Sequence, residues 1–271
     1  MTYKLLALDL DGTVMGHDLV IAQELVDAVA EARAAGIHVT IATGRMFFAT
    51  LPYAQQLGIT TPIICYQGGM VRDPLSGAML HHITMPAEAA AEALEELAAD
   101  GIFAIAYIDE KLHIAERRPE LDQYLSYHPE GVEVVVEPEL ASYARSRPPT
   151  KILFLAEPPV VERELARMSA LFGERLSVVR SHTLFGELTA PGISKGSALA
   201  MLAEDLGVAR EETVAIGDQE NDIPMIAWAG LGLAMGNAIP AVKEIAAAVV
   251  PPVEELGVVW AIRRYLLGRA R

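Results

Sequence analysis

The sequence has little cysteine, no long apolar run and few positive charges. Of its 271 residues only Cys65 is a cysteine, which excludes an intrachain disulfide and favours a reducing compartment, so we expect a cytoplasmic protein. No stretch approaches the ~20 uninterrupted apolar residues of a membrane span. Near the N-terminus, Asp9 interrupts the apolar run after a handful of residues, which is too early for a secretory signal. The length suffices for one large domain or two modest ones.

Positive charge is scarce. The chain has 21 Lys and Arg residues against 36 Asp and Glu residues, which gives a formal net charge of −15 at pH 7. Such a surface repels phosphate backbones and anionic lipid headgroups, so we expect neither a nucleic acid polymer nor a membrane as partner. A small anionic substrate would need local cations or a metal ion to offset this field.

Apolar runs of strand length alternate with segments of helix length at both ends of the chain. This alternation predicts βαβ units and a mainly parallel sheet with helices on both faces, which is a doubly wound α/β fold. The expected strands cover residues 3–9, 37–43, 61–67, 212–218 and 230–235. The expected helices cover residues 22–35, 46–57, 194–207, 220–229, 239–247 and 254–267.

The middle of the chain has a different pattern. An Ala- and Glu-rich segment predicts a helix over residues 86–100, and apolar runs on either side of Asp109-Glu110 predict a β-hairpin. Further strands are expected at 132–137, at 150–157 and as a pair within 176–190, with a helix at 160–172. Paired strands with two or three helices indicate an α+β module. We place it at residues 83–188, inserted into an α/β domain formed by residues 1–82 and 189–271.

Four expected strands deliver polar or small residues to the carboxyl edge of the sheet, where open α/β sheets bind their ligands. These strand ends are Asp9-Leu10-Asp11-Gly12-Thr13, Thr43-Gly44-Arg45, Gln67-Gly68-Gly69 and Gly217-Asp218-Gln219-Glu220-Asn221-Asp222. A cation is added by Lys195, at the start of an expected helix. Together these segments predict one site beyond the strand ends.

Up to four carboxylates would share that site, those of Asp9, Asp11, Asp218 and Asp222. Like charges at such range are unfavourable without a counter-ion. A hard divalent cation relieves the repulsion, and Mg²⁺ suits oxygen ligands and shares itself with phosphate. Lys195 and the hydroxyl of Thr43, with N–H groups near the glycines, supply donors for phosphate oxygens. One carboxylate can then act as nucleophile while another handles the proton of the leaving oxygen.

The motifs DLDGT, TGR, GISKG and GDQENDIPM, in this order, resemble the four motifs of the haloacid dehalogenase superfamily. The chain is most similar to the Cof-like phosphatase branch, which has an α/β cap inserted between the second and third motifs. The C-terminal segment AMGNAIPAVKEIA is typical of that branch. The resemblance covers nearly the whole chain. It implies a Rossmann-like core with an inserted cap and a Mg²⁺-dependent phosphatase activity.

The resemblance also implies residue roles. Asp9 would attack phosphorus, and Asp11 would protonate the leaving alcohol and then activate water to hydrolyse the aspartyl-phosphate. The metal would be bound by Asp9, the carbonyl of Asp11, Asp218 and, directly or through water, Asp222. The phosphate would be bound by Thr43, Gly44, Lys195 and Asn221. Separately from the resemblance, the substrate is expected to contact Arg45, Gln67 and Gly68 at the strand ends, and Arg180 and His182 as polar strand residues of the inserted module. For Arg45, a structural ion pair is an equal alternative.

Three other classes of protein share parts of this pattern. A dinucleotide-binding oxidoreductase needs G-x-G-x-x-G after the first strand, where this chain has DLDGTV, so we discount it. A phosphotransferase or phosphomutase, with a sugar hydroxyl as acceptor, is compatible with the motifs. A non-catalytic phosphate-ligand-binding protein should lack the nucleophile or the acid, and both Asp9 and Asp11 are present. We therefore predict hydrolysis of a sugar phosphate, a cofactor phosphate or a nucleotide. The pattern does not indicate an oligomeric state.

Overall fold

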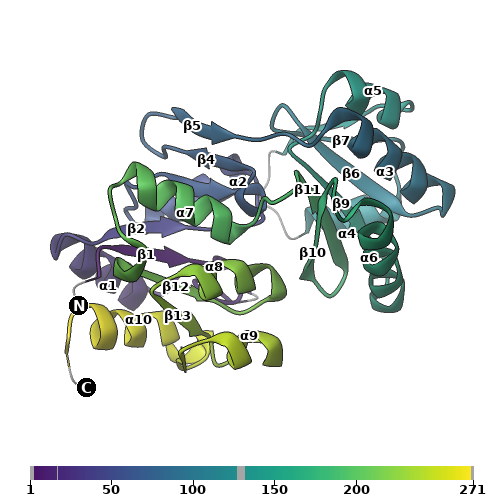
Figure 1. The fold of residues 1–271 in the computed structure, drawn as a ribbon. Coiled ribbons are helices and arrows are strands. Elements are labelled where there is room, and N and C mark those ends of the chain that lie inside the picture. Colours follow the sequence, from purple (N-terminus) through teal and green to yellow (C-terminus); the bar gives the residue numbers. More distant parts are fainter. Residues whose placement is uncertain (1–2, 17, 127–131, 270–271) are drawn as a thin grey trace. The chain divides into compact units, whose positions relative to one another are not determined.

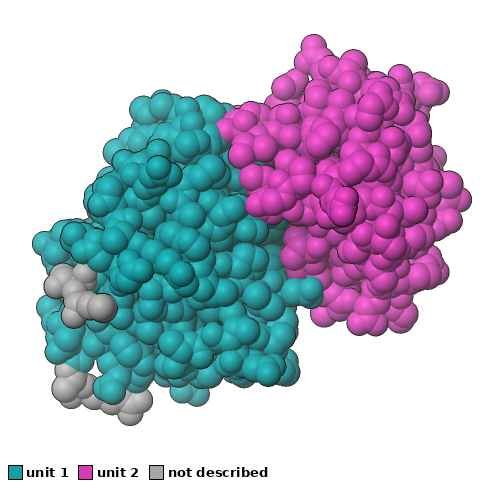
Figure 2. All heavy atoms as spheres, in the orientation of Figure 1, with its two compact units in different colours: residues 1–81, 194–271 teal, residues 82–193 magenta. Residues whose placement is uncertain are grey.

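The computed structural model describes residues 3–16, 18–126 and 132–269, and the chain divides into two compact units. One unit comprises Met1–His81 together with Ser194–Arg271, and the other comprises His82–Ile193 (Figure 2). The chain therefore leaves the first unit once and returns to it. No helix in the described part of the chain is long and apolar enough to cross a membrane.

The first unit is built on a five-stranded parallel sheet in the order β14-β13-β12-β1-β2 (Figure 1). Its strands are β1 (Leu5–Leu8), β2 (His38–Ile41), β12 (Thr213–Gly217), β13 (Leu231–Ala234) and β14 (Ala248–Val249). Every residue of β1 and β12 is buried, which requires cover on both faces of the sheet. The doubly wound, mainly parallel architecture predicted from the sequence is thus confirmed.

Helices supply that cover. They are α1 (Gln23–Ala34), α2 (Phe47–Gln56), α7 (Lys195–Asp205), α8 (Ile223–Trp228), α9 (Pro240–Ile245) and α10 (Gly257–Ala261). Helix α1 packs against β2 and α10, and α7 packs against α8 (Figure 1). The helix expected over 254–267 is α-helical only within α10. Leu256, with a φ of 58°, separates α10 from a preceding 3₁₀ turn. A π-helical turn follows α10.

Of the strand expected at residues 61–67, only residues 63–65 form a strand. Strand β3 (Ile63–Cys65) lies beside β2 through a single parallel bridge and then turns back at Tyr66–Gly68. It pairs antiparallel with β4 (Met70–Arg72). Strand β5 (Met79–His82) lies on the other side of β4 and completes a three-stranded sheet. Positive φ angles throughout the turn reverse the chain. Gln67 and Gly68 therefore lie in a tight turn.

The second unit contains a six-stranded sheet in the order β10-β11-β9-β6-β7-β8. Its strands are β6 (Phe103–Ile108), β7 (Lys111–Ile114), β8 (Val134–Val136), β9 (Lys151–Leu155), β10 (Ser177–His182) and β11 (Phe185–Thr189). The hairpin expected at Asp109-Glu110 is confirmed, because β6 pairs antiparallel with β7 on either side of it. Both turn residues have positive φ, as the common two-residue hairpin turn requires.

The described part of the second unit has four helices, where two or three were expected. They are α3 (Ala87–Ala99), α4 (Pro119–Leu125), α5 (Leu140–Ser146) and α6 (Pro158–Phe172). Helices α4 and α5 have seven residues each, too few to show a clear helical periodicity. Residues of α3, α5 and α6 join one face of the sheet in a hydrophobic core that includes Leu97, Ile152 and Phe154.

Candidate active site

The carboxyl ends of β1 and β12 place two aspartates together. The two strands pair in parallel with Leu8 opposite Ile216, and the backbone N–H of Asp9 donates to the carbonyl of Ile216 at 3.0 Å. Asp9 and Asp218 follow the last residues of these strands, and they are only 5% and 3% exposed. The register of the sheet therefore brings both carboxylates to one edge.

A tight turn after β12 adds a third carboxylate. The segment Glu220–Asp222 forms a 3₁₀ turn, so the helix expected at 220–229 begins only at Ile223. Oδ2 of Asp222 accepts hydrogen bonds from the backbone N–H groups of Asp218 and Gln219, both at 2.9 Å. Carboxylate oxygens of Asp9, Asp218 and Asp222 lie within 4.8 Å of one another. These three side chains are termed the carboxylate cluster.

Lys195 places a cation in the cluster. It is the first residue of α7, whose start is held by a capping box between Ser194 and Ser197. The Lys195 ammonium is 2.5 Å from Oδ1 of Asp9 and 2.6 Å from Oδ1 of Asp222, and its side chain is 1% exposed. With all three carboxylates ionised, one ammonium leaves the cluster with two negative charges in excess.

This imbalance changes the proton affinity of the cluster. Burial, followed by the charge of Asp222, raises the pKa of Asp9 well above its usual value. Burial and Asp222 also raise the pKa of Asp218 to about 7. Burial lowers the pKa of Lys195, but the carboxylates of Asp222 and Asp9 outweigh it, and the pKa of Lys195 is raised overall. A divalent cation with oxygen ligands would relieve the excess charge, so the donor set fits a magnesium ion.

The loop after β1 closes around Asp218. Gly12 has a φ of 83°, and a Cβ atom there would lie 2.5 Å from Oδ2 of Asp218, so the position requires glycine. The hydroxyl of Thr13 donates to Oδ1 of Asp218 at 3.2 Å, and Nε2 of Gln219 donates to Oδ2 at 3.0 Å. Thr13 and Gln219 were not among the predicted site residues. Their place inside two motifs was the available signal, but their contacts with Asp218 depend on the fold.

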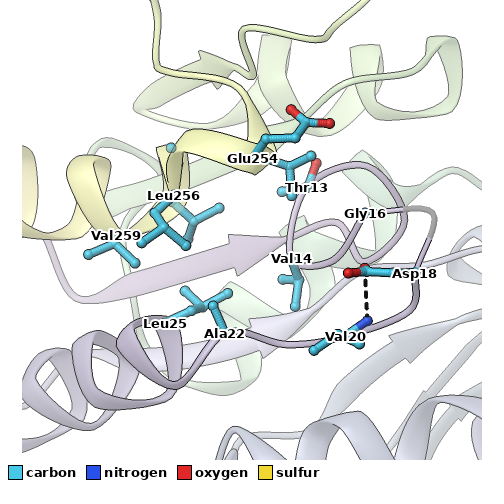
Figure 3. A pocket seen from close by; sticks show the side chains of 13 residues that line it. Thr13, Val14, Gly16, Asp18, Val20, Ala22, Leu25, Glu254, Leu256 and Val259 are labelled. Carbon is cyan, nitrogen blue, oxygen red and sulfur yellow. Dashed lines mark hydrogen bonds between the residues drawn. The ribbon is translucent and has the colours of Figure 1, made fainter.

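A pocket of about 350 Å³ lies beside the same loop (Figure 3). Thr13, Val14 and Leu25 line it together with residues of the segment 253–259. Its described lining residues include no member of the carboxylate cluster. The pocket is therefore distinct from the cluster, although Thr13 contacts both.

Asp11 has a different environment from Asp9. Its side chain is 49% exposed, and its carboxylate accepts two hydrogen bonds from one arginine. Nε of Arg45 donates to Oδ2 at 2.7 Å and Nη2 donates to Oδ1 at 2.6 Å. Arg45 itself is only 7% exposed. Of the two alternatives considered for Arg45, the ion pair is therefore present.

The β2–α2 loop packs against the turn after β3. The N–H of Gln67 donates to the carbonyl of Thr43 at 3.1 Å, and the N–H of Arg45 donates to the Thr43 hydroxyl at 3.2 Å. A Cβ atom on Gly44 would collide with the amide of Gln67. The second and third strand ends are thus in direct contact.

The same turn reaches the third and fourth motifs. Oε1 of Gln67 accepts a hydrogen bond from Nδ2 of Asn221 at 3.0 Å. Oδ1 of Asn221 is buried and has no hydrogen-bond partner among the described residues. Gly68 has a φ of 104°, and a Cβ atom there would collide with the carbonyl of Ser194, next to Lys195. These contacts join the turn after β3 to the 3₁₀ turn at Glu220–Asp222 and to the start of α7.

Arg180 and His182 lie on β10 of the second unit, and both are half-buried. Nη2 of Arg180 is 3.3 Å from Oε1 of Glu162 on α6. The ring of His182 packs against Phe185, with the ring centroids 4.9 Å apart. Each residue thus has a contact inside its own unit, and its expected role toward a leaving group stays a prediction.

Comparison with known proteins identifies the family. Residues 6–262 match the model of the haloacid dehalogenase-like hydrolases, so the chain belongs to that family. It is 30% identical to phosphatase YwpJ of Bacillus subtilis, over 97% of this chain and 100% of that protein. It is also 30% identical to pyridoxal phosphate phosphatase YbhA of Escherichia coli, over 90% of this chain and 91% of that protein.

A solved structure supports the same assignment. A haloacid dehalogenase-like hydrolase from Bacillus subtilis aligns with a TM-score of 0.85 at 30% identity, over 97% of this chain and 100% of that chain. The resemblance drawn from the four motifs is therefore confirmed. The protein is a phosphatase that acts on small phosphorylated substrates.

Proposed function

We propose that the protein is a Mg²⁺-dependent phosphatase that hydrolyses a small phosphorylated metabolite through an aspartyl-phosphate on Asp9. The observation that carries this proposal is the carboxylate cluster, where three buried carboxylates share one buried ammonium. The ligands would be the carboxylates of Asp9 and Asp218 with the backbone carbonyl of Asp11. When bound, Mg²⁺ would keep these carboxylates ionised and neutralise charge on the phosphoryl group.

Asp222 is better suited to organise the cluster than to bind the metal directly. One of its oxygens accepts from Lys195 and the other accepts two backbone N–H groups. Asp222 thus has three donors, one of them a cation, whereas Asp218 has two neutral side-chain donors. Of the two alternatives for Asp222, we propose that it contacts the metal through water and that it holds Lys195 and the turn after β12 in place.

The chain's own residues would divide the chemistry. Asp9 attacks phosphorus, the P–O bond to the leaving alcohol breaks, and the alcohol oxygen takes a proton from Asp11. Asp11 then removes a proton from water, which attacks phosphorus, releases phosphate and restores the Asp9 carboxylate. Lys195, Thr43 and the N–H of Gly44 offset the charge on the phosphoryl oxygens. The buried Oδ1 of Asn221, which has no hydrogen-bond partner among the described residues, would accept a hydrogen bond from a donor that contacts the phosphate.

Substrate choice is assigned to the second unit. We propose residues 1–82 and 189–271 as the catalytic core and residues 83–188 as a cap that selects the leaving group and excludes water. Arg180 and His182 remain the candidate selecting residues on this unit. The relative YbhA is named for pyridoxal phosphate, which supports a cofactor phosphate among the three expected substrate classes of sugar phosphate, cofactor phosphate and nucleotide.

The test is phosphate release from a panel of small phosphate esters, with Mg²⁺ and with EDTA. We expect metal-dependent release that falls by about a thousandfold or more in Asp9→Asn. Asp27→Asn is the matched control, because Asp27 is an exposed aspartate of α1 in the same unit. Equal release by wild type and Asp9→Asn would contradict the proposal. Release of the leaving alcohol without phosphate, with the phosphoryl group found on an added second hydroxyl compound, would instead indicate a phosphotransferase.

A further inference from the structure

We propose that Arg45 is a positioning residue for proton transfer: its guanidinium fixes the orientation of the Asp11 carboxyl group toward the leaving group. The inference rests on the proposed function, in which Asp11 is the general acid. It goes beyond that function because Arg45 was expected either to contact the substrate or to form an ion pair with a purely structural role. We assign it a third role, which acts through Asp11.

The geometry of the pair carries the proposal. Both donors of one edge of the guanidinium face both oxygens of Asp11, at 2.7 and 2.6 Å. A two-pronged pair of this kind holds the carboxylate plane, whereas a single hydrogen bond would leave it free to rotate. A carboxylate has about four lone-pair sites, of which the fork takes one on each oxygen. The remaining sites and the 49% exposure of the side chain leave Asp11 open to a proton acceptor.

Arg45 is itself held in place. Its backbone N–H donates to the Thr43 hydroxyl at 3.2 Å, and its carbonyl accepts from the N–H of Tyr66 at 3.0 Å. The guanidinium carbon lies 5.6 Å from the ring centroid of Tyr53 on α2. Arg45 is also only 7% exposed, so the surrounding atoms leave its side chain little freedom to move. The β2–α2 loop therefore imposes the orientation of Asp11.

Asp11 depends on this one anchor. In the part of the chain that the structure describes, both hydrogen bonds accepted by the Asp11 carboxylate come from Arg45. Asp9, by contrast, is enclosed and paired with Lys195. Without Arg45, the half-exposed carboxyl group of Asp11 would rotate freely. We therefore expect the loss of Arg45 to slow reactions that need a well-placed proton and to spare those that do not.

A leaving-group series makes this distinction. p-Nitrophenyl phosphate releases a stable anion and needs little help from an acid, whereas an alkyl phosphate must be protonated as its P–O bond breaks. The measured quantity is kcat/KM, which covers the steps up to departure of the leaving alcohol. For Arg45→Lys, which keeps the charge and loses the fork, we expect a fall of about 30-fold or more on the alkyl ester and about threefold or less on the p-nitrophenyl ester.

The double variant tests whether the effect passes through Asp11. Asp11→Asn should show the same leaving-group selectivity, and adding Arg45→Lys to it should cause no further selective loss. The ratio of kcat/KM between the two esters does not depend on the fraction of folded enzyme, so partial unfolding does not obscure the result. Arg45→Gln provides a second variant. Arg72→Lys is the matched control, because Arg72 lies on β4 and its guanidinium packs over Phe47.

Each alternative gives a different result. An equal loss on both esters would mean that Arg45 only ties two loops together, and unchanged or faster turnover would mean that the ion pair restrains Asp11. A selective loss that persists in the Asp11→Asn background would mean that Arg45 contacts the leaving group itself. Any of these overturns the inference. Failure of the proposed function is separate, since wild type would then release no phosphate or Asp9→Asn would match it.

Discussion

Asp9 and Asp11 are two residues apart and differ in almost every physical respect. Asp9 is buried, paired with Lys195 and has a raised pKa. Asp11 is half-exposed and paired with Arg45. A nucleophile benefits from a dry, fixed position, whereas a group that exchanges protons with an alcohol and with water needs access. The division of roles that we propose follows from these two environments.

Gly12 lies between Asp11 and Thr13 and lets the loop after β1 approach Asp218. We predict that Gly12→Ala lowers activity by about a hundredfold and lowers stability by more than the ~1–3 kcal/mol of a strained left-handed residue. The control is Gly36→Ala, since Gly36 has a similar φ of 85° but nothing within 4 Å of an added Cβ. Phosphate release and thermal unfolding measure the two effects. Gly12→Ala with the activity of Gly36→Ala would show that the close approach is unimportant.

At the scale of elements, the start of α7 determines where Lys195 lies. The hydroxyl of Ser194 accepts from the N–H of Ser197 at 3.1 Å, and the Ser197 hydroxyl accepts from the N–H of Ser194 at 2.9 Å. Lys195 follows this cap directly and reaches Asp9 across 186 residues of sequence. The capping of α7 at Ser194 therefore helps to determine where the Lys195 ammonium lies in the cluster.

We predict that Ser194→Ala lowers the free energy of unfolding by about 1 kcal/mol, because it removes the side-chain acceptor of the cap. It should also lower kcat/KM several-fold, because Lys195 loses its fixed starting point. Ser142→Ala, at an exposed position of α5, is the control and should change neither quantity. Denaturant unfolding and phosphate release test this. A stability loss with wild-type activity would separate the cap from the site.

The sequence was sufficient to predict the elements that carry the motifs. Strands β1 and β12 end in motif aspartates, and the alternation of strands and helices placed those ends at one edge. The hairpin of β3 and β4 was missed because its reversal depends on positive φ at Tyr66 and Gln67, which are not typical turn residues. The pairing of Arg45 with Asp11 could not be predicted, because a side-chain contact between two loops depends on the relative placement of their backbones.

At the scale of the whole molecule, excess negative charge is both general and local. The chain carries a net charge of −15, and part of it is buried in the carboxylate cluster, where three carboxylates face the one ammonium of Lys195. A cation that binds only the folded state stabilises it by mass action. Metal binding and stability should therefore be linked in this protein.

The size of the stabilisation by metal depends on pH. Because the pKa of Asp218 is raised to about 7, the folded chain holds that proton more tightly than the unfolded chain. In EDTA, the contribution of Asp218 to stability is therefore greatest at low pH and is lost as the pH rises through about 7. We predict that Mg²⁺ raises the melting temperature more at pH 8 than at pH 5, and that Asp218→Asn reduces this difference. An equal effect of Mg²⁺ at both pH values would contradict the prediction.

The central claim is that Asp9 becomes phosphorylated, and chemical trapping tests it most directly. Borohydride reduces an acyl phosphate to an alcohol. The protein would be quenched with borohydride during turnover of p-nitrophenyl phosphate, and its peptides would be analysed by mass spectrometry. We predict conversion of Asp9 to homoserine, with a higher yield in Asp11→Asn, where hydrolysis of the intermediate is slowed. Steady turnover with Asp9 unmodified, or with another residue converted, would contradict the account.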